Sequence, residues 1–205
     1  MNTPDFQSFP KLSRLSRECI ITEKIDGTNA QILITEDGQF FAGSRTRWIT
    51  PAQDNHGFAR WAHEHREELM QLGPGRHFGE WWGSGIQRGY GLTKGEKRWS
   101  LFNVARWCLV GDTPKRIPTA DQRVEKYQDV LPSCCSLVPV LYRGIFSTTA
   151  CDVALGCLRE HGSVAAPGFL QPEGIVCFHI AGNVGFKKTL NNDGQSKSTL
   201  NSINP

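Results

Sequence analysis

Apolar residues in this chain gather in short runs, most of them bounded by glycine, proline or small polar residues. Runs rich in β-branched and aromatic residues with this punctuation predict strands. The clearest case is residues 31–35 and 39–42, because Asp37-Gly38 between them is a strong signal for a β-hairpin. The other predicted strands cover residues 18–22, 76–82, 99–110, 137–142, 175–180 and 184–188.

Three longer segments have the apolar spacing of helices. In the first, Asp54 or Asn55 can cap a helix that Gly73-Pro74-Gly75 ends. The second covers residues 119–131, and the third runs from Ser147 or Thr148 to His161. Because strands dominate and no parallel β-α-β repeat is visible, the pattern predicts an α+β fold of antiparallel β-sheets flanked by helices.

The composition is that of a globular protein with one sizeable core: 205 residues, of which 39% are hydrophobic and 21% charged. The N-terminus lacks the apolar core of a signal peptide, and no apolar run is long enough to span a membrane. Seven cysteines without paired spacing favour a reduced protein over a disulfide framework or a zinc site. We therefore expect a cytoplasmic protein, or one in the host cytoplasm if its source is viral, with no membrane partner.

The formal net charge of +3 is too small to indicate a polyanionic partner, so a surface for nucleic acid must come from local clusters. One cluster, Lys94, Lys97 and Arg98 beside Tyr90 and Trp99, has the basic and aromatic character of such a surface, although a solvated loop is an equal alternative. The glycine-rich segment 83–91 before it matches neither the Walker spacing nor the dinucleotide fingerprint. We expect that segment to be a flexible surface loop.

The segment with the most chemical potential is Glu23-Lys24-Ile25-Asp26-Gly27-Thr28-Asn29. Its lysine ends an apolar run, where an ammonium is costly unless it has a partner or a function. Lysine can form a covalent intermediate when burial or nearby cations lower its pKa, and glycine lets the backbone approach a ligand closely. The alternative for so short a pattern is an ordinary exposed lysine before a turn.

Several segments, taken in order over residues 20–190, resemble motifs of the covalent nucleotidyltransferase superfamily of polynucleotide ligases and mRNA capping enzymes. They are most similar to the type 2 phage-like and RNA-editing ATP-dependent RNA ligases, in which asparagine follows the Gly-Thr of the nucleophile motif. The segments are Glu23–Asn29, Ser44-Arg45, Phe78-Gly79-Glu80, Leu101-Phe102-Asn103-Val104, Glu173-Gly174-Ile175-Val176 and Lys187-Lys188. The resemblance implies the nucleotidyltransferase fold.

The resemblance also implies an ATP-dependent RNA ligase that uses Mg²⁺ or Mn²⁺. Lys24 would attack the α-phosphate of ATP and carry AMP, which would pass to a 5′-phosphate end and leave when a 3′-hydroxyl seals the strand. Asp26 would orient the lysine, while Lys187 and a metal ion bound by Glu173 would favour its nucleophilic form. The implied ATP-binding residues are Glu23, Ile25, Gly27, Asn29, Arg45, Glu80, Phe102 and Lys188, with Arg45 and Glu80 at the ribose and phosphate and Phe102 on the adenine.

Two departures from the family pattern keep alternatives open. Asp26 stands where these RNA ligases often have histidine, so a minimal ATP-dependent DNA ligase is one alternative. Lys187 and Lys188 are adjacent where the family has Lys-x-Lys, and adjacent strand residues face opposite sides, so only one of them is expected in the site, Lys187 first. A non-catalytic module that binds nucleotides or RNA ends on a ligase fold is the remaining alternative.

We expect residues 1–190 to form a single nucleotidyltransferase domain and residues 191–205 a flexible tail. Too few residues follow Lys188 for the OB-fold or helical domain that such ligases usually append. The grip on nucleic acid would then come from the cluster between Tyr90 and Trp99, from a dimer, or from an accessory protein.

Overall fold

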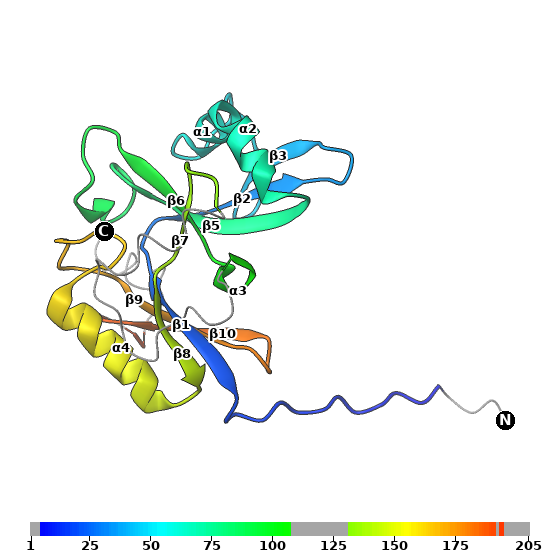
Figure 1. Cartoon of the computed structure of the whole chain (residues 1–205), viewed down its shortest axis with the longest axis vertical. Helices are drawn as coiled ribbons and strands as arrows, with labels where there is room; N and C mark the ends of the chain where they lie inside the picture. Colours follow the sequence, from blue (N-terminus) through cyan, green and yellow to red (C-terminus); the bar gives the residue numbers. More distant parts are fainter. Residues whose placement is uncertain (1–4, 108–130, 192, 195–205) are drawn as a thin grey trace.

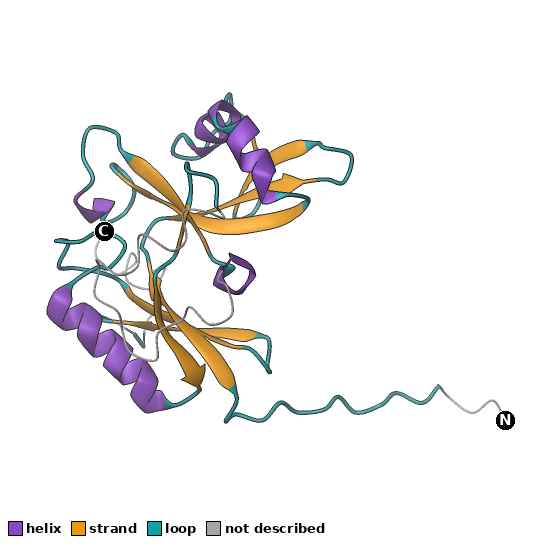
Figure 2. Cartoon of the chain, in the orientation of Figure 1, coloured by secondary structure: helices purple, strands orange, loops and turns teal. Residues whose placement is uncertain are grey.

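Two β-sheets form the framework of the computed structural model, which describes residues 5–107, 131–191, 193 and 194 (Figures 1 and 2). The first sheet is antiparallel and has the strand order β10-β9-β1-β8. Its strands are β1 (Glu18–Lys24), β8 (Val140–Ile145), β9 (Gly174–His179) and β10 (Val184–Thr189). Of the helix predicted over residues 119–131, all but Leu131 lies outside the described residues, as does most of the predicted tail.

The second sheet has the strand order β4-β3-β2-β5-β6-β7 and is antiparallel except for the pair β6–β7. Its strands are β2 (Thr28–Ile34), β3 (Phe40–Ser44), β4 (Trp48–Ile49), β5 (Gly75–Gly83), β6 (Lys97–Leu101) and β7 (Ser136–Leu137). Strands β2 and β3 form the hairpin that Asp37-Gly38 predicts. The chain passes from the first sheet to the second through a three-residue link, residues 25–27.

Helices cover one face of each sheet (Figure 2). Helix α4 (Thr148–His161) packs on the first sheet, and its ends are those expected from the sequence: the Ser147 hydroxyl accepts a hydrogen bond from the Ala150 N–H. The second sheet is covered by α1 (Phe58–Glu64), α2 (Arg66–Leu69) and the short 3₁₀ helix η1 (Met70–Leu72). The remaining helices are η2 (Gly89–Gly91) and α3 (Val104–Trp107).

The buried apolar residues fall into three clusters. One lies between the second sheet and α1–η1, and another between the first sheet and α4. The third joins the two sheets and contains Ile20, Ile25, Trp82, Tyr90, Val104, Val138 and Ala166. None of the helices in the described part of the chain has the length and apolar character that a membrane span needs.

Two predicted strands differ from the structure. The strand predicted over residues 99–110 is wrong for residues 102–107, because the Val104 N–H donates to the Phe102 carbonyl and the chain turns into α3. Residues 108–110 lie outside the described residues. The strand predicted over residues 137–142 is divided into β7 and β8, which belong to different sheets. Pro139, between them, has no N–H to donate to a ladder.

Within residues 83–91, expected to be a flexible surface loop, the structure has the short helix η2 and buries Ile86, whereas the basic residues Lys94 and Arg98 of the neighbouring cluster are exposed. The aromatic rings of Tyr90 and Trp99 are buried, Tyr90 in the cluster between the sheets and Trp99 beneath α1. Apolar burial therefore fixes this segment, and neither ring is exposed for stacking on a nucleic-acid base.

Candidate active site

Lys24 is the last residue of β1, and Glu173 directly precedes β9, its antiparallel neighbour. The Lys24 ammonium donates to Glu173 Oε2 over 2.5 Å. The Lys24 side chain keeps 23% of its surface exposed, whereas Glu173 keeps 3%. The strand pairing thus places a partly accessible ammonium against a buried carboxylate, which excludes the interpretation of Lys24 as an ordinary solvated lysine.

The link from β1 to β2 is held from two directions. The Asp26 N–H donates to the Tyr90 hydroxyl oxygen over 2.9 Å, and the Gly27 N–H donates to Glu80 Oε1 over 3.0 Å. A Cβ atom at Gly27 would meet the Trp81 carbonyl oxygen and lie 2.8 Å from the Trp82 Cβ. Glycine is therefore required at this position by the close approach of β5, and the ATP-binding role expected for Gly27 stays a prediction.

Glu80, on β5, closes the other side of the site. Its Oε2 accepts a hydrogen bond from Asn29 Nδ2 over 3.0 Å, so that two members of the predicted nucleotide site contact each other directly. Burial raises the pKa of the Glu80 carboxyl to about 7, the Lys24 ammonium opposes that rise, and the Glu173 carboxylate adds to it. Lys24, Glu80 and Glu173 therefore act on one another electrostatically although they come from three separate segments of the chain.

Asp26 has a partner that the sequence analysis missed. Arg88 Nε lies 3.0 Å from Asp26 Oδ2, and Arg88 also donates to the Gln171 carbonyl oxygen over 3.0 Å. The arginine thus connects the nucleophile motif to the segment that leads into Glu173. The sequence around Arg88 matches no known phosphate-binding motif. It also contains no local pattern that indicates a contact with Asp26, 62 residues away.

The register of the first sheet separates the two adjacent lysines. Lys187 pairs with Val176, which pairs with Thr22, so Lys187 lies on the same face of the sheet as Lys24, two residues beyond Thr22. Lys188 pairs with Ile175 on the opposite face, beneath α4, where its ammonium donates to Asp152 Oδ1 over 2.6 Å. The geometry favours Lys187 for the site, and a catalytic role for it stays a prediction.

Two residues of the nucleophile motif have side chains committed to the fold. The buried Glu23 carboxylate accepts hydrogen bonds from the Ser163 hydroxyl and from the N–H groups of Val164 and Ala165, at 2.6, 2.8 and 2.9 Å. Ile25 lies in the apolar cluster between the sheets. Any contact of these two residues with a nucleotide would therefore involve the backbone, and the nucleotide-binding role predicted for them remains untested.

Arg45 and Phe102 lie on the rim of the arrangement. Arg45 is exposed in the turn between β3 and β4, where Glu80 is not its ion-pair partner within the described residues. Phe102 follows β6, is partly exposed, and donates its N–H to the Phe78 carbonyl. Both are accessible to a ligand, as a nucleotide-binding role requires.

The residues present fit a magnesium ion that is bound jointly with a substrate. Mg²⁺ usually takes one or two carboxylates, with waters and phosphate oxygens as its other ligands. Glu173 offers a buried carboxylate beside Lys24, and in the part of the chain that the structure describes no group of three or more histidine, cysteine, aspartate or glutamate side chains is arranged to hold a metal. Glu173 is therefore the protein group that would hold the ion.

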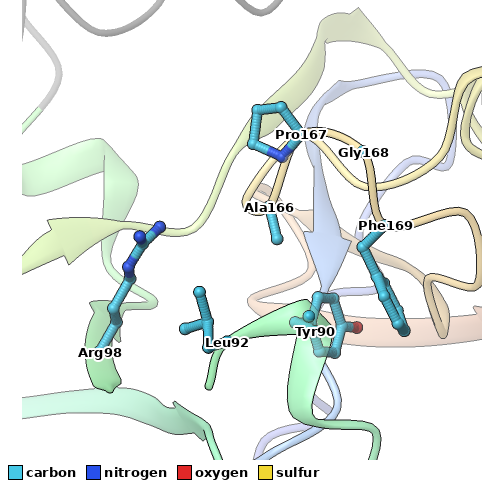
Figure 3. Close-up of a pocket in the computed structure, with 8 residues that line it drawn as sticks. Tyr90, Leu92, Arg98, Ala166, Pro167, Gly168 and Phe169 are labelled. Carbon is cyan, nitrogen blue, oxygen red and sulfur yellow. The ribbon is translucent and has the colours of Figure 1, made fainter. Parts of the chain in front are cut away.

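A separate pocket of about 370 Å³ lies between η2 and the segment after α4 (Figure 3). It is lined by Tyr90, Gly91, Leu92, Arg98 and residues 166–169. Among the residues predicted for the nucleotide site, none lines this pocket. Tyr90 connects the two places, because its hydroxyl also contacts the Asp26 N–H.

Comparison with known proteins agrees with the motif pattern. A family model described as RNA ligase matches residues 17–184. Comparison with curated proteins finds no match.

Solved structures of mutants of Naegleria gruberi RNA ligase resemble this fold. One, with ATP and Mn, is 18% identical with a TM-score of 0.52 and covers 92% of this chain and 52% of that one. Another, with AMP and Mn, is 18% identical with a TM-score of 0.52 and covers 98% and 59%. An apo form is 18% identical, has a TM-score of 0.54 and also covers 98% and 59%. The present chain thus spans between half and two thirds of the length of these structures.

Proposed function

The chain belongs to the RNA ligase family, and we propose that it is an ATP-dependent RNA ligase that works through a lysyl-adenylate on Lys24. The observation that carries this proposal is the position of the Lys24 ammonium, 2.5 Å from the Glu173 carboxylate at a strand end and on the same sheet face as Lys187. A lysine so placed is both accessible and surrounded by the charged groups that phosphoryl chemistry uses.

In the proposed first step, the Lys24 nitrogen forms a bond to the α-phosphorus of ATP, and the bond from that phosphorus to the bridging oxygen breaks to release pyrophosphate. Lys24 must first lose a proton, and Glu173 is the base nearest to it. A magnesium ion, when bound, supplies positive charge that offsets the phosphates. Lys187 would add a second positive charge from the same face of the sheet.

Glu80 and Asn29 are the groups proposed to hold the ribose. A carboxyl group whose pKa is about 7 can accept or donate a hydrogen bond near neutral pH, and a sugar hydroxyl can do both. Phe102 offers an exposed ring for the adenine, and Arg45 a cation for a phosphate. ATP or AMP with Mn in the similar solved structures supports this choice of nucleotide and of a divalent metal.

In the later steps, AMP would pass to a 5′-phosphate end of RNA, and a 3′-hydroxyl would displace AMP to form the phosphodiester bond. The family supports RNA as the substrate. A DNA ligase and a non-catalytic module that binds nucleotides or RNA ends are the competing functions. A dimer or an accessory protein that assists RNA binding, and a cytoplasmic location, also belong to this proposal.

The test is incubation with α-labelled ATP and Mg²⁺, followed by denaturing electrophoresis, for the wild type, Lys24→Ala and Lys11→Ala. We expect label on the wild type and on Lys11→Ala, which changes an exposed lysine outside the site, and none on Lys24→Ala. A wild type that binds ATP without becoming labelled would establish the binding module instead. Sealing of nicked DNA in preference to nicked RNA by a labelled wild type would establish the DNA ligase.

A further inference from the structure

The face of the second sheet that points away from α1 carries a group of exposed aromatic rings. Along β2, Ala30, Ile32 and Ile34 pack beneath α1, so the alternate residues Asn29, Gln31 and Leu33 lie on the opposite face. On that opposite face Phe41, Trp48, Phe78 and Phe102 expose 38, 48, 49 and 40% of their surface. We call these four residues the aromatic face.

The sheet register places the aromatic face directly beside the proposed nucleotide site. Glu80 pairs with Asn29 across β5 and β2. Two residues further along the same strands, Phe78 pairs with Gln31, and the row continues through Gly43 to Trp48. Phe102, the residue proposed to stack on adenine, occupies the other end of this row next to Phe78, to whose carbonyl its N–H donates.

Trp48 is held in place although it is exposed. Its pairing partner, Gly43, leaves room for the indole, because a Cβ at Gly43 would lie 3.0 Å from Trp48 Cε3. The Phe41 ring centroid lies 5.6 Å from that of Trp48, and the Arg76 guanidinium lies 5.3 Å from the Trp48 centroid. Arg76 is fixed in turn by a hydrogen bond to Gln31 Oε1 over 2.6 Å. A ring fixed in this way loses little conformational entropy when it binds a ligand.

Three arginines lie beside the aromatic face. Arg45 and Arg47 are exposed in the turn that carries Trp48, and Arg76 lies next to its ring. Within the described ranges none of these three arginines forms an ion pair. Exposed aromatic rings with arginines between them suit single-stranded nucleic acid, whose bases stack and whose phosphates need cations, better than an apolar protein surface.

We infer that the aromatic face is a binding subsite for the unpaired nucleotides of RNA next to the end that is being adenylated. This inference rests on the proposed function, in which Glu80 and Phe102 hold the nucleotide. The RNA next to the adenylated end would then lie on the aromatic face beside them. Bases would stack on Trp48 and Phe78, and the backbone phosphates would meet Arg47 and Arg76. Duplex RNA would bind poorly here, because its base faces are already stacked.

The experiment measures two properties of each variant: labelling by α-labelled ATP, and binding of a short fluorescent oligouridylate by anisotropy. Trp48→Ala is expected to weaken oligouridylate binding by about 5- to 150-fold, the usual loss for one stacked base. Its labelling should stay at the wild-type level, which also shows that it is folded. Trp48→Phe should restore most of the binding, because a ring is retained. Phe41→Ala, which removes a support of the same ring, serves as a second variant if Trp48→Ala is poorly produced.

Phe9→Ala is the matched control, because Phe9 is an exposed aromatic residue in the segment before β1, and it should bind oligouridylate as the wild type does. Wild-type binding by both Trp48→Ala and Phe41→Ala would overturn the inference, and so would equal competition by blunt duplex RNA. If the wild type takes no label but Trp48→Ala still loses oligouridylate binding, the proposed ligase fails while the subsite stands.

Discussion

The Lys24 ammonium and the Glu173 carboxylate lie 2.5 Å apart, yet the lysine side chain is 23% exposed and the glutamate only 3%. Removal of the lysine and removal of the glutamate should therefore have unequal effects on stability. A lysine that loses its carboxylate still has water, whereas a buried carboxylate that loses its ammonium has much less.

We accordingly predict that Lys24→Met lowers the free energy of unfolding by about 3 kcal/mol, because it takes a close ammonium away from a carboxylate that is 3% exposed. Glu173→Gln should cost less than about 1 kcal/mol, because the Lys24 ammonium that it leaves is partly hydrated. Urea denaturation of both variants measures the difference. Equal losses of stability would show that the pair is not asymmetric.

The opposite faces occupied by Lys187 and Lys188 give a second prediction. Lys187→Ala should lower the rate of labelling by ATP by about two orders of magnitude, as the loss of one group that stabilises developing charge often does. Lys188→Ala should change that rate by no more than about twofold, because its ammonium pairs with Asp152 on the α4 side and two surface charges contribute little. The reverse ranking in a rapid-quench assay would assign the site to Lys188.

The raised pKa of Glu80 predicts a stability that depends on pH. Burial holds this pKa at about 7, above its ordinary value of 4.5, so the stability that the protonated form provides is complete below pH 4.5 and is lost as the pH rises through 7. Glu80→Gln stays neutral and lacks this loss. The free energy of unfolding of Glu80→Gln, compared with that of the wild type, should therefore rise by up to about 3 kcal/mol between pH 4.5 and pH 8. A difference that does not change with pH, measured by urea denaturation, would contradict the prediction.

Glu23 should prove to be a structural residue of the nucleophile motif. Glu23→Ala leaves the Ser163 hydroxyl and the N–H groups of Val164 and Ala165 without their acceptor, and we expect a loss of about 3 kcal/mol. Glu18→Ala, at the exposed start of the same strand, removes a carboxylate that pairs with Arg143 and should cost less than about 1 kcal/mol. Thermal unfolding monitored by circular dichroism compares them, and similar melting temperatures would argue against this role.

The elements that the sequence predicts correctly are those whose signals are local. Asp37-Gly38 forms the tip of the β2–β3 hairpin, and Ser147 caps α4, because a turn or a cap depends on residues within a few positions of it. The end of β6 at Leu101 has no such signal. β5 continues beyond Gly79, the partner of Leu101, so the strand ends where the chain turns to bury Val104 between the sheets, which is a tertiary effect.

The candidate site divides in the same way. Motif order indicates Lys24, Glu80 and Glu173 as members of one site, and the structure brings their carboxylates and ammonium into electrostatic contact. Arg88 escapes sequence reasoning because its partner Asp26 lies far away in the sequence. The exposed position of Trp48 escapes it as well, since an aromatic residue in a strand is more often in the core.

The three-residue link between the sheets, residues 25–27, has a mechanical consequence. Lys24 and Lys187 lie in the first sheet and Glu173 directly precedes one of its strands, whereas Glu80 and most of the aromatic face lie in the second sheet. The distance between Lys24 and a substrate bound on the second sheet therefore depends on the angle between the two sheets, which the chain links at residues 25–27 and again between β7 and β8. A change in the angle between the two sheets, even one caused far from Lys24, would alter the distance that the lysine must reach. It would do so without changing any group that performs the chemistry.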